Sequence, residues 1–173
     1  GADPATQEPV EDRFLVLARD PGGAVLLVSS REGGRTTTLD PPIVYMPPVL
    51  EPGQTFEHES RAIVTDDRGR EQSRGRAVRR IEYVGDEEFT ATANPPMPPT
   101  RVRVVRAELD LDLFPARIVT KTTFWIDQRG IAREQQTTRV RILGVPAETR
   151  RHDIVLREVR DLPGIPHGAE AGK

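Results

Sequence analysis

Three carboxylates, Glu108, Asp110 and Asp112, recur at every second position of one segment. In an extended strand this spacing places all three on one face, and convergent carboxylates are ligands that calcium prefers. Neighbours on one face of a strand stand about 7 Å apart, which is too wide for one ion without further ligands from a loop. Pairing with arginines on the next strand is therefore the favoured interpretation, and no metal or other cofactor is predicted.

His58 lies between Glu57 and Glu59, so one hypothesis is an acid–base group that a carboxylate orients. A histidine in such a segment is more often an ordinary exposed strand residue. None of the four serines lies in a Gly-x-Ser-x-Gly elbow, no Walker loop occurs, and the chain has no cysteine to act as a thiol nucleophile. We therefore expect a protein that is not an enzyme, and a hydrolase that uses His58 with carboxylates ranks third among the hypotheses.

A group of arginines surrounds Gly69, and further arginines follow at positions 79 and 80. Arginine presents paired donors that suit an anionic headgroup, a polysaccharide or an acidic partner. Acidic residues at positions 66, 67, 71 and 82 are interleaved with them, so a charge-balanced hairpin tip is the favoured interpretation. The candidate partner-binding loop consists of Arg68, Arg70, Arg74 and Arg76.

The composition limits the classes of protein to which this chain can belong. With 173 residues, a single domain is expected. The formal net charge is −2, so the basic excess typical of a nucleic-acid-binding protein is missing. No apolar run approaches the ~20 residues of a membrane-spanning helix, and no transmembrane segment is predicted.

The ends of the chain differ in composition from its middle. The first residues lack both a methionine and an apolar stretch, and they are typical of a flexible tether that remains after a signal peptide has been removed. We expect a tether over residues 1–10, one β domain over 11–162 and a disordered tail over 163–173. This interpretation favours an exported protein of the bacterial periplasm or cell envelope.

Alternation of apolar and polar residues predicts strands along most of the middle region. The pattern is plain over residues 102–114, where a change of parity near Val105 and Arg106 predicts a β-bulge. Residues 118–126 and 131–143 form a predicted hairpin, and Asp127–Gly130 between them holds a three-residue loop in which Gly130 supplies the left-handed residue.

Further strands are expected on both sides of this hairpin. A turn at residues 20–23 joins strands at 14–17 and 25–28, and other strands are predicted at 55–65, 77–84, 88–93 and 152–159. A short helix over 147–159 is the alternative for the last of these. Proline pairs at 41–42 and 47–48 indicate crossings or sheet edges. The fold class is therefore all-β: a mainly antiparallel curled sheet, a half-barrel or a barrel-like sandwich with little helix.

The alternating strands also suggest an inner surface. A curled sheet can fill its concave face with side chains or leave a cavity for an acyl chain, and a filled core is the more frequent outcome. The candidate apolar lining consists of Leu109, Leu111, Leu113, Phe124 and Trp125.

Two segments, residues 48–56 and 122–134, resemble exported bacterial β proteins of the lipoprotein-carrier type. In that group an aromatic strand ends in an Asp-x-x-Gly turn and a polar strand follows, as residues 127–130 do here. The resemblance covers about residues 48–160 and implies an open half-barrel curled around an apolar concavity. Members of the group close that concavity with helices, whereas no helix of ten or more residues is predicted in this chain.

These observations lead to a ranked set of functional hypotheses. The first is a non-catalytic, envelope-associated β module that binds a hydrophobic small molecule or lipoprotein-like cargo. The alternative is a structural or assembly module that contacts an envelope protein through the arginine-bearing loop or proline-flanked edges. The oligomeric state is left open.

Overall fold

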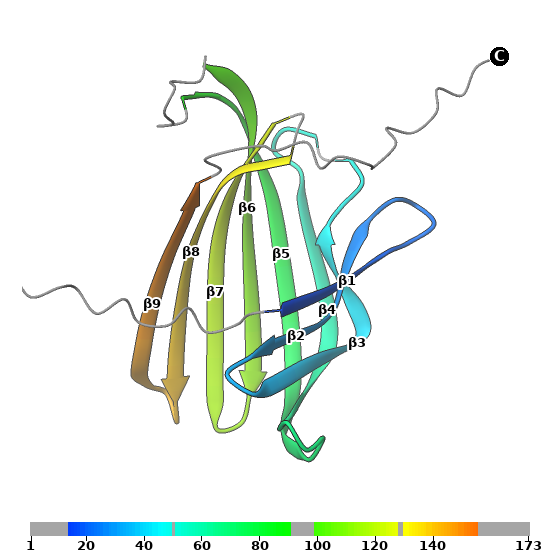
Figure 1. Ribbon diagram of the computed structural model, residues 1–173, viewed down its shortest axis with the longest axis vertical. Coiled ribbons are helices and arrows are strands. Elements are labelled where there is room, and N and C mark those ends of the chain that lie inside the picture. The colour runs from blue at the N-terminus through cyan, green and yellow to red at the C-terminus, as the bar shows by residue number, and fades with distance from the viewer. Residues whose placement is uncertain (1–13, 50, 91–98, 128–129, 156–173) are drawn as a thin grey trace, which may run out of the picture.

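The computed structural model describes residues 14–49, 51–90, 99–127 and 130–155. These residues form one nine-stranded sheet in which every strand pairs antiparallel with the next along the chain (Figure 1). The all-β, curled-sheet prediction is confirmed. The predicted tether and tail lie outside the described residues. The strands are β1 (Phe14–Arg19), β2 (Val25–Glu32), β3 (Arg35–Met46), β4 (Thr55–Thr65), β5 (Glu71–Phe89), β6 (Thr100–Leu113), β7 (Ala116–Asp127), β8 (Gly130–Ile142) and β9 (Val145–Val155).

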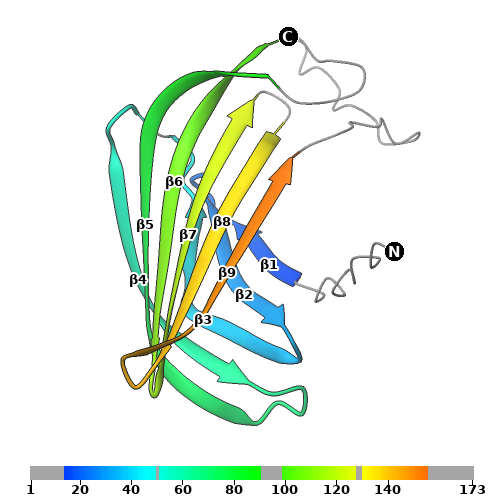
Figure 2. The same ribbon diagram turned by 90° about the vertical axis from the view of Figure 1, so that its left-hand side faces the viewer.

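The sheet is strongly curled, so β1–β3 lie inside the curve that β4–β9 make (Figure 2). One face of β6 and β7, which carries Leu109, Leu111 and Phe124, faces this interior and is called the concave face. The other face, which carries Asp110 and Arg117, is called the convex face. Within the described ranges, no helix is long and apolar enough to cross a membrane.

The core lies between the early strands and the concave face of β4–β7. One buried cluster joins side chains of β2 and β3 to side chains of β4–β6, and the partly buried Leu109, Leu111 and Ile118 pack against it. A second cluster is built around Phe124 of β7 and Tyr83 of β5. Burial of apolar surface, at about 25 cal/mol per Å², favours the packing of β2 and β3 over the concave face of β4–β7. The first cluster contains Leu27, Leu39, Ile43, Ala62, Val64, Ala77 and Leu113.

The bulge predicted in residues 102–114 lies in the neighbouring strand instead. Tyr83 pairs with Val105 and Gly85 pairs with Val104, so the extra residue is Val84 of β5. Gly85 has a φ of +147°, a conformation that glycine adopts at little cost. The parity of β6 changes because Val104 and Val105 are both buried, on opposite faces. Consequently residues 77–84 and 88–89 belong to one strand, not to the two separate strands predicted at 77–84 and 88–93. Residues 91–93 of the second prediction lie outside the described residues.

Two other local predictions need correction. Asp127 pairs directly with Gly130, so this glycine begins β8 and does not occupy a loop position. Residues 145–155 form strand β9, and the alternative of a helix over 147–159 is wrong for the described part. Residues 156–159 lie outside the described residues.

The prolines at positions 41 and 42 mark the bend at which β3 leaves β4. Pairing between these strands ends at Asp40 and Arg61. Beyond the prolines, β3 continues beside β2, where Leu27 pairs with Ile43. Because proline has no N–H to donate, it suits a position where the ladder ends. This bend turns the second half of β3 across the concave face.

Candidate functional site

The three leucines predicted as lining lie together on the concave face of β6, because alternate residues of a strand share a face. Leu113 is only 4% exposed and belongs to the first core cluster. Leu109 and Leu111 are half-buried at the margin of that cluster. Burial therefore decreases along β6, from Leu113 in the filled core to the partly exposed Leu111 and Leu109.

Phe124 and Trp125 point to opposite faces, since they are neighbours in β7. Phe124 is 1% exposed and packs edge-to-face against Tyr45, with ring centroids 6.1 Å apart. The indole N–H of Trp125 instead donates to Glu87 at 3.3 Å, and the Arg133 guanidinium lies 4.9 Å from the indole ring. Strand alternation thus separates Trp125 from the other four candidate lining residues.

A row of half-buried apolar side chains crosses the concave face from β6 to β8. Leu111 pairs with Ile118, and Ile118 pairs with Val140, so the three side chains lie side by side. Leu109 lies next to them on β6, and all four are half-buried. We call these four residues the concave row. Ile118 and Val140 follow the predicted alternation, but only the pairing shows that they extend the leucine surface.

Polar side chains border the concave row on the side that leads along β7 to Phe124 and the second core cluster. Thr120 and Thr138 are paired across β7 and β8, and their hydroxyl oxygens lie 3.2 Å apart. The Gln136 amide donates to the Thr138 hydroxyl at 3.3 Å. Thr120 and Thr138 are half-buried, Gln136 is buried, and residues 145–154 of the next strand, β9, are all exposed. The row therefore has an apolar wall and a polar margin.

Arg79, which follows the arginine-bearing loop in the sequence, lies apart from that loop in the structure. It lies on the concave side of β5, opposite His58 of β4 and Leu109 of β6, and is 4% exposed. Its Nη2 donates to the carbonyl oxygen of Tyr45 at 3.1 Å, and its guanidinium lies 4.6 Å above the Tyr45 ring. Arg79 thus fixes the part of β3 that crosses the sheet. The sequence signal for the burial of Arg79 is its place in the alternation of residues 77–83, where Ala77, Ile81 and Tyr83 share its face.

His58 binds backbone where the ladder between β3 and β4 has ended. The N–H of Val44 donates to His58 Nδ1 at 3.1 Å, and the Ser60 hydroxyl donates to the Pro41 carbonyl at 2.6 Å. Buried backbone polar groups need such partners. The two flanking carboxylates, Glu57 and Glu59, point to the convex face instead. The structure therefore gives His58 a bridging contact and does not bring it together with its neighbouring glutamates.

The three carboxylates of β6 lie on the convex face beside basic residues of the adjacent strands. Glu108 lies 3.1 Å from Lys121 and 3.4 Å from Arg80. Asp110 accepts two hydrogen bonds from Arg117, at 2.9 and 2.5 Å, and these hold the pKa of Asp110 below its ordinary value. No group of three His, Cys, Asp or Glu residues able to hold a metal occurs in the described parts of the chain.

Three of the four arginines proposed as a partner-binding loop are paired with carboxylates. Arg70 lies 2.9 Å from Asp66, and Arg74 lies 2.6 Å from Glu71. Arg76 lies 2.6 Å from Glu59 and lowers the pKa of that carboxyl through a hydrogen bond. Arg68 donates its backbone N–H to Asp66 at 3.0 Å. These pairings neutralise much of the field that the loop would otherwise present to an anion.

No protein-family model, curated protein or solved structure matches this chain. The resemblance to the lipoprotein-carrier type stays a prediction, and the functional argument depends on the geometry of the sheet.

Proposed function

We propose that this domain is a non-catalytic binding module that holds an elongated hydrophobic ligand, such as an acyl chain, against the concave row. The observation that carries the proposal is the partial burial of Leu109, Leu111, Ile118 and Val140 in the middle of a concave sheet face. Ligand sites are typically concave and mostly apolar, with a few polar groups that fix orientation.

The polar margin supports a ligand with a polar end. The paired hydroxyls of Thr120 and Thr138 lie next to the apolar row, and the buried Gln136 amide behind them donates to Thr138. Hydroxyl and amide groups can both donate and accept hydrogen bonds, so they suit a carboxyl or ester group. An amphipathic lipid, with its chain along the row and its head at the threonines, fits this arrangement better than a wholly apolar molecule.

Binding of a fluorescent long-chain fatty acid, cis-parinaric acid, tests the proposal. Val140 is the best position to change, because it lies in the row but outside both core clusters. We expect Val140→Gln to weaken binding about tenfold, since a buried valine contributes ~1.5 kcal/mol or more.

The matched control is Val119→Gln, which alters a half-buried valine one position from Ile118, on the convex face of β7. This control should bind the probe like the wild type. Absence of binding by the wild type, or equal losses in both variants, would contradict the proposal.

An envelope location belongs to the same proposal, and it depends on the resemblance in residues 48–56 and 122–134. Fractionation of cells that express the complete gene tests it. The protein should be recovered with the periplasmic or membrane fractions, and recovery with the cytoplasmic fraction would contradict this location.

A second function, that of an assembly module, is favoured by the exposed apolar residues of β1. Phe14, Val16 and Leu17 are exposed on a strand at the end of the sheet order. Such an edge can accept a strand from a partner protein. Val16→Lys should abolish capture of an envelope partner and leave fatty-acid binding intact, whereas a ligand carrier should bind the probe without any partner.

A further inference from the structure

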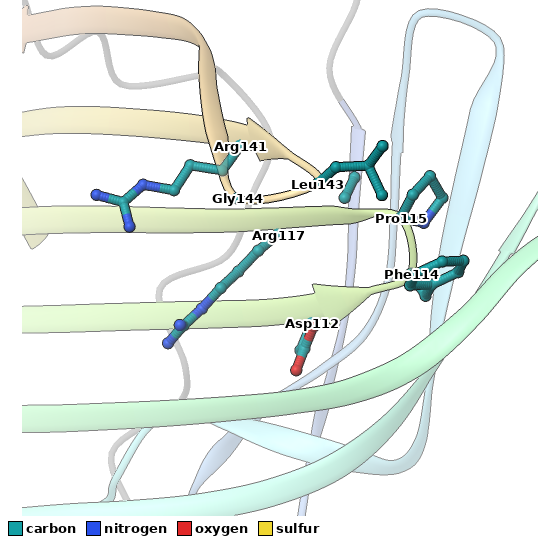
Figure 3. A pocket seen from close by; sticks show the side chains of 8 residues that line it. Asp112, Phe114, Pro115, Arg117, Arg141, Leu143 and Gly144 are labelled. Carbon is teal, nitrogen blue, oxygen red and sulfur yellow. The ribbon is translucent and has the colours of Figure 1, made fainter.

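Two neighbouring turns expose large apolar side chains at one end of the sheet. Phe114 follows β6 and is 81% exposed, and Leu143 follows β8 and is 72% exposed. Residues flanking the second turn, Ile142 and Val145, are exposed as well. Figure 3 shows Phe114, Pro115 and Leu143 side by side at the ends of their strands. Turns are usually polar, so these residues need an explanation beyond the fold.

The two turns are fixed to each other. The N–H of Leu143 donates to the carbonyl oxygen of Pro115 at 2.9 Å. A shallow hollow of about 290 Å³ lies between the turns, with Phe114, Pro115 and Leu143 on its apolar side and Asp112, Arg117 and Arg141 on its charged side (Figure 3). The apolar side chains are therefore presented as one surface and not as two independent tips.

Leu143 is an unfavourable residue for the turn that it occupies. Its φ is +50°, and Gly144 follows with a φ of +81°. Two-residue turns with positive φ at both positions favour Asn-Gly, because a leucine side chain is strained in the left-handed region. Since Leu143 is mostly exposed, burial within this chain does not offset the strain. A contact outside the chain would do so.

Basic residues lie behind the apolar turns on the convex face. Arg117 and Arg141 are directly opposite each other in β7 and β8, an arrangement that is destabilising for like charges. Arg117 is paired with Asp110. Arg139, two residues before Arg141, and Arg141 itself make no ion pair within the described residues. An external anion would relieve the repulsion and pair with these two guanidinium groups.

We propose that this end of the protein docks on the surface of an anionic lipid bilayer. Phe114 and Leu143 enter the boundary between headgroups and acyl chains, and Arg139 and Arg141 contact lipid phosphates. Protruding apolar residues with cations set back from them match the depth profile of a bilayer interface. The charged β4–β5 turn lies at the same end but further round the curl (Figure 2). This proposal is independent of ligand binding at the concave row.

Co-sedimentation with vesicles tests the proposal. The wild type should bind vesicles made of equal parts phosphatidylglycerol and phosphatidylcholine, and should bind pure phosphatidylcholine much more weakly. Leu143→Asn should reduce binding about tenfold, the effect of losing one buried leucine. Arg141→Gln should reduce it about fivefold, as expected for one arginine near an anionic surface.

Leu143→Asn separates docking from folding, because asparagine tolerates positive φ and should raise the temperature of unfolding. Two control substitutions alter exposed residues elsewhere: Ile154→Ser near the other end of β9 and Arg35→Gln at the start of β3. Both should bind like the wild type. The proposal is overturned if the wild type binds neither vesicle, binds both equally, or loses no binding with Leu143→Asn.

Discussion

At the scale of single residues, polar side chains maintain the sheet where the backbone ladder fails. His58 and Ser60 bind the backbone of β3 after it has turned away from β4. Arg79 binds the same strand further on, at the Tyr45 carbonyl. Of these three residues, His58 was the candidate for acid–base chemistry. Their contacts give them a structural role, since each pairs with a backbone group that the bend leaves without a ladder partner.

A single glycine permits the close approach of β5 and β6. A Cβ atom at Gly75 would lie 1.8 Å from the backbone oxygen of Asp112, and that oxygen is held in the sheet. We expect Gly75→Ala to lower the free energy of unfolding by about 3 kcal/mol or more, because backbone must shift. Chemical denaturation measures this change. Gly22→Ala, where the nearest atom is a side-chain oxygen at 3.4 Å, is the control and should cost much less.

At the scale of elements, the two faces of β5–β7 are specialised. The concave face carries apolar residues that pack under β2 and β3. The convex face carries ion pairs that link adjacent strands, including Glu59 with Arg76 and Asp110 with Arg117. Exposed pairs of this kind add little stability each. These pairs do, however, place opposite charges next to each other between every two neighbouring strands from β4 to β7. Like charges at the same positions would destabilise this arrangement of strands.

The Asp110–Arg117 pair predicts a dependence of stability on pH. The pKa of Asp110 is lower in the folded protein than in the unfolded chain, so the unfolded chain binds more protons as the pH falls. The stability from this pair is complete above the ordinary aspartate pKa of about 3.9 and is lost as the pH falls through the lowered value. Asp110→Asn should therefore be less stable than the wild type at neutral pH.

Thermal unfolding measured from neutral pH down to below about pH 4 checks this expectation. The difference between Asp110→Asn and the wild type should shrink at the acidic end of the range. Asp112→Asn, two residues further on the same face, is the control. A difference that stays constant with pH would contradict the assigned role of the pair.

At the scale of the whole molecule, the curl brings β9, the last strand of the sheet, near β2, the second strand. Arg150 of β9 lies 3.0 Å from Glu32, at the end of β2. The two residues are separated by 118 positions in the sequence. Both side chains are partly exposed, so the pair contributes less than ~1 kcal/mol to stability. We expect the ion pair to hold β9 in position, because β9 has β8 as its one neighbour in the sheet order.

Glu32→Gln should therefore increase hydrogen exchange at the amides of β9 and leave the exchange of β5 and β6 unchanged. The physical reason is that β9 loses its contact across the open side of the curl, while its pairing with β8 persists. Hydrogen–deuterium exchange read by mass spectrometry resolves the two regions. Asp40→Asn removes a comparable exposed pair, Asp40 with Arg61, between strands that are already adjacent, and should not alter β9. Equal effects of the two variants would contradict this role.

The sequence alone determined the class of fold and most of the strands. Two-residue periodicity is a local property, so residues 102–114 and 118–126 could be assigned without knowledge of their neighbours. The convex pairing of the β6 carboxylates was predicted for the same reason, since alternation fixes their common face. Errors arose where tertiary contacts bury both faces of a strand: Val104 and Val105 imitated a bulge that belongs to Val84 of β5.

Which side chains meet depends on how the strands pair and curl. The concave row needs the pairing of Leu111, Ile118 and Val140 across three strands, and the apolar turns need the contact between Leu143 and Pro115. Neither follows from spacing along the chain, because strand pairing and curl are set by burial of the whole sheet against itself. Trp125 is the opposite case: its residue type suggested the interior, although alternation along the chain already put it on the other face from Phe124.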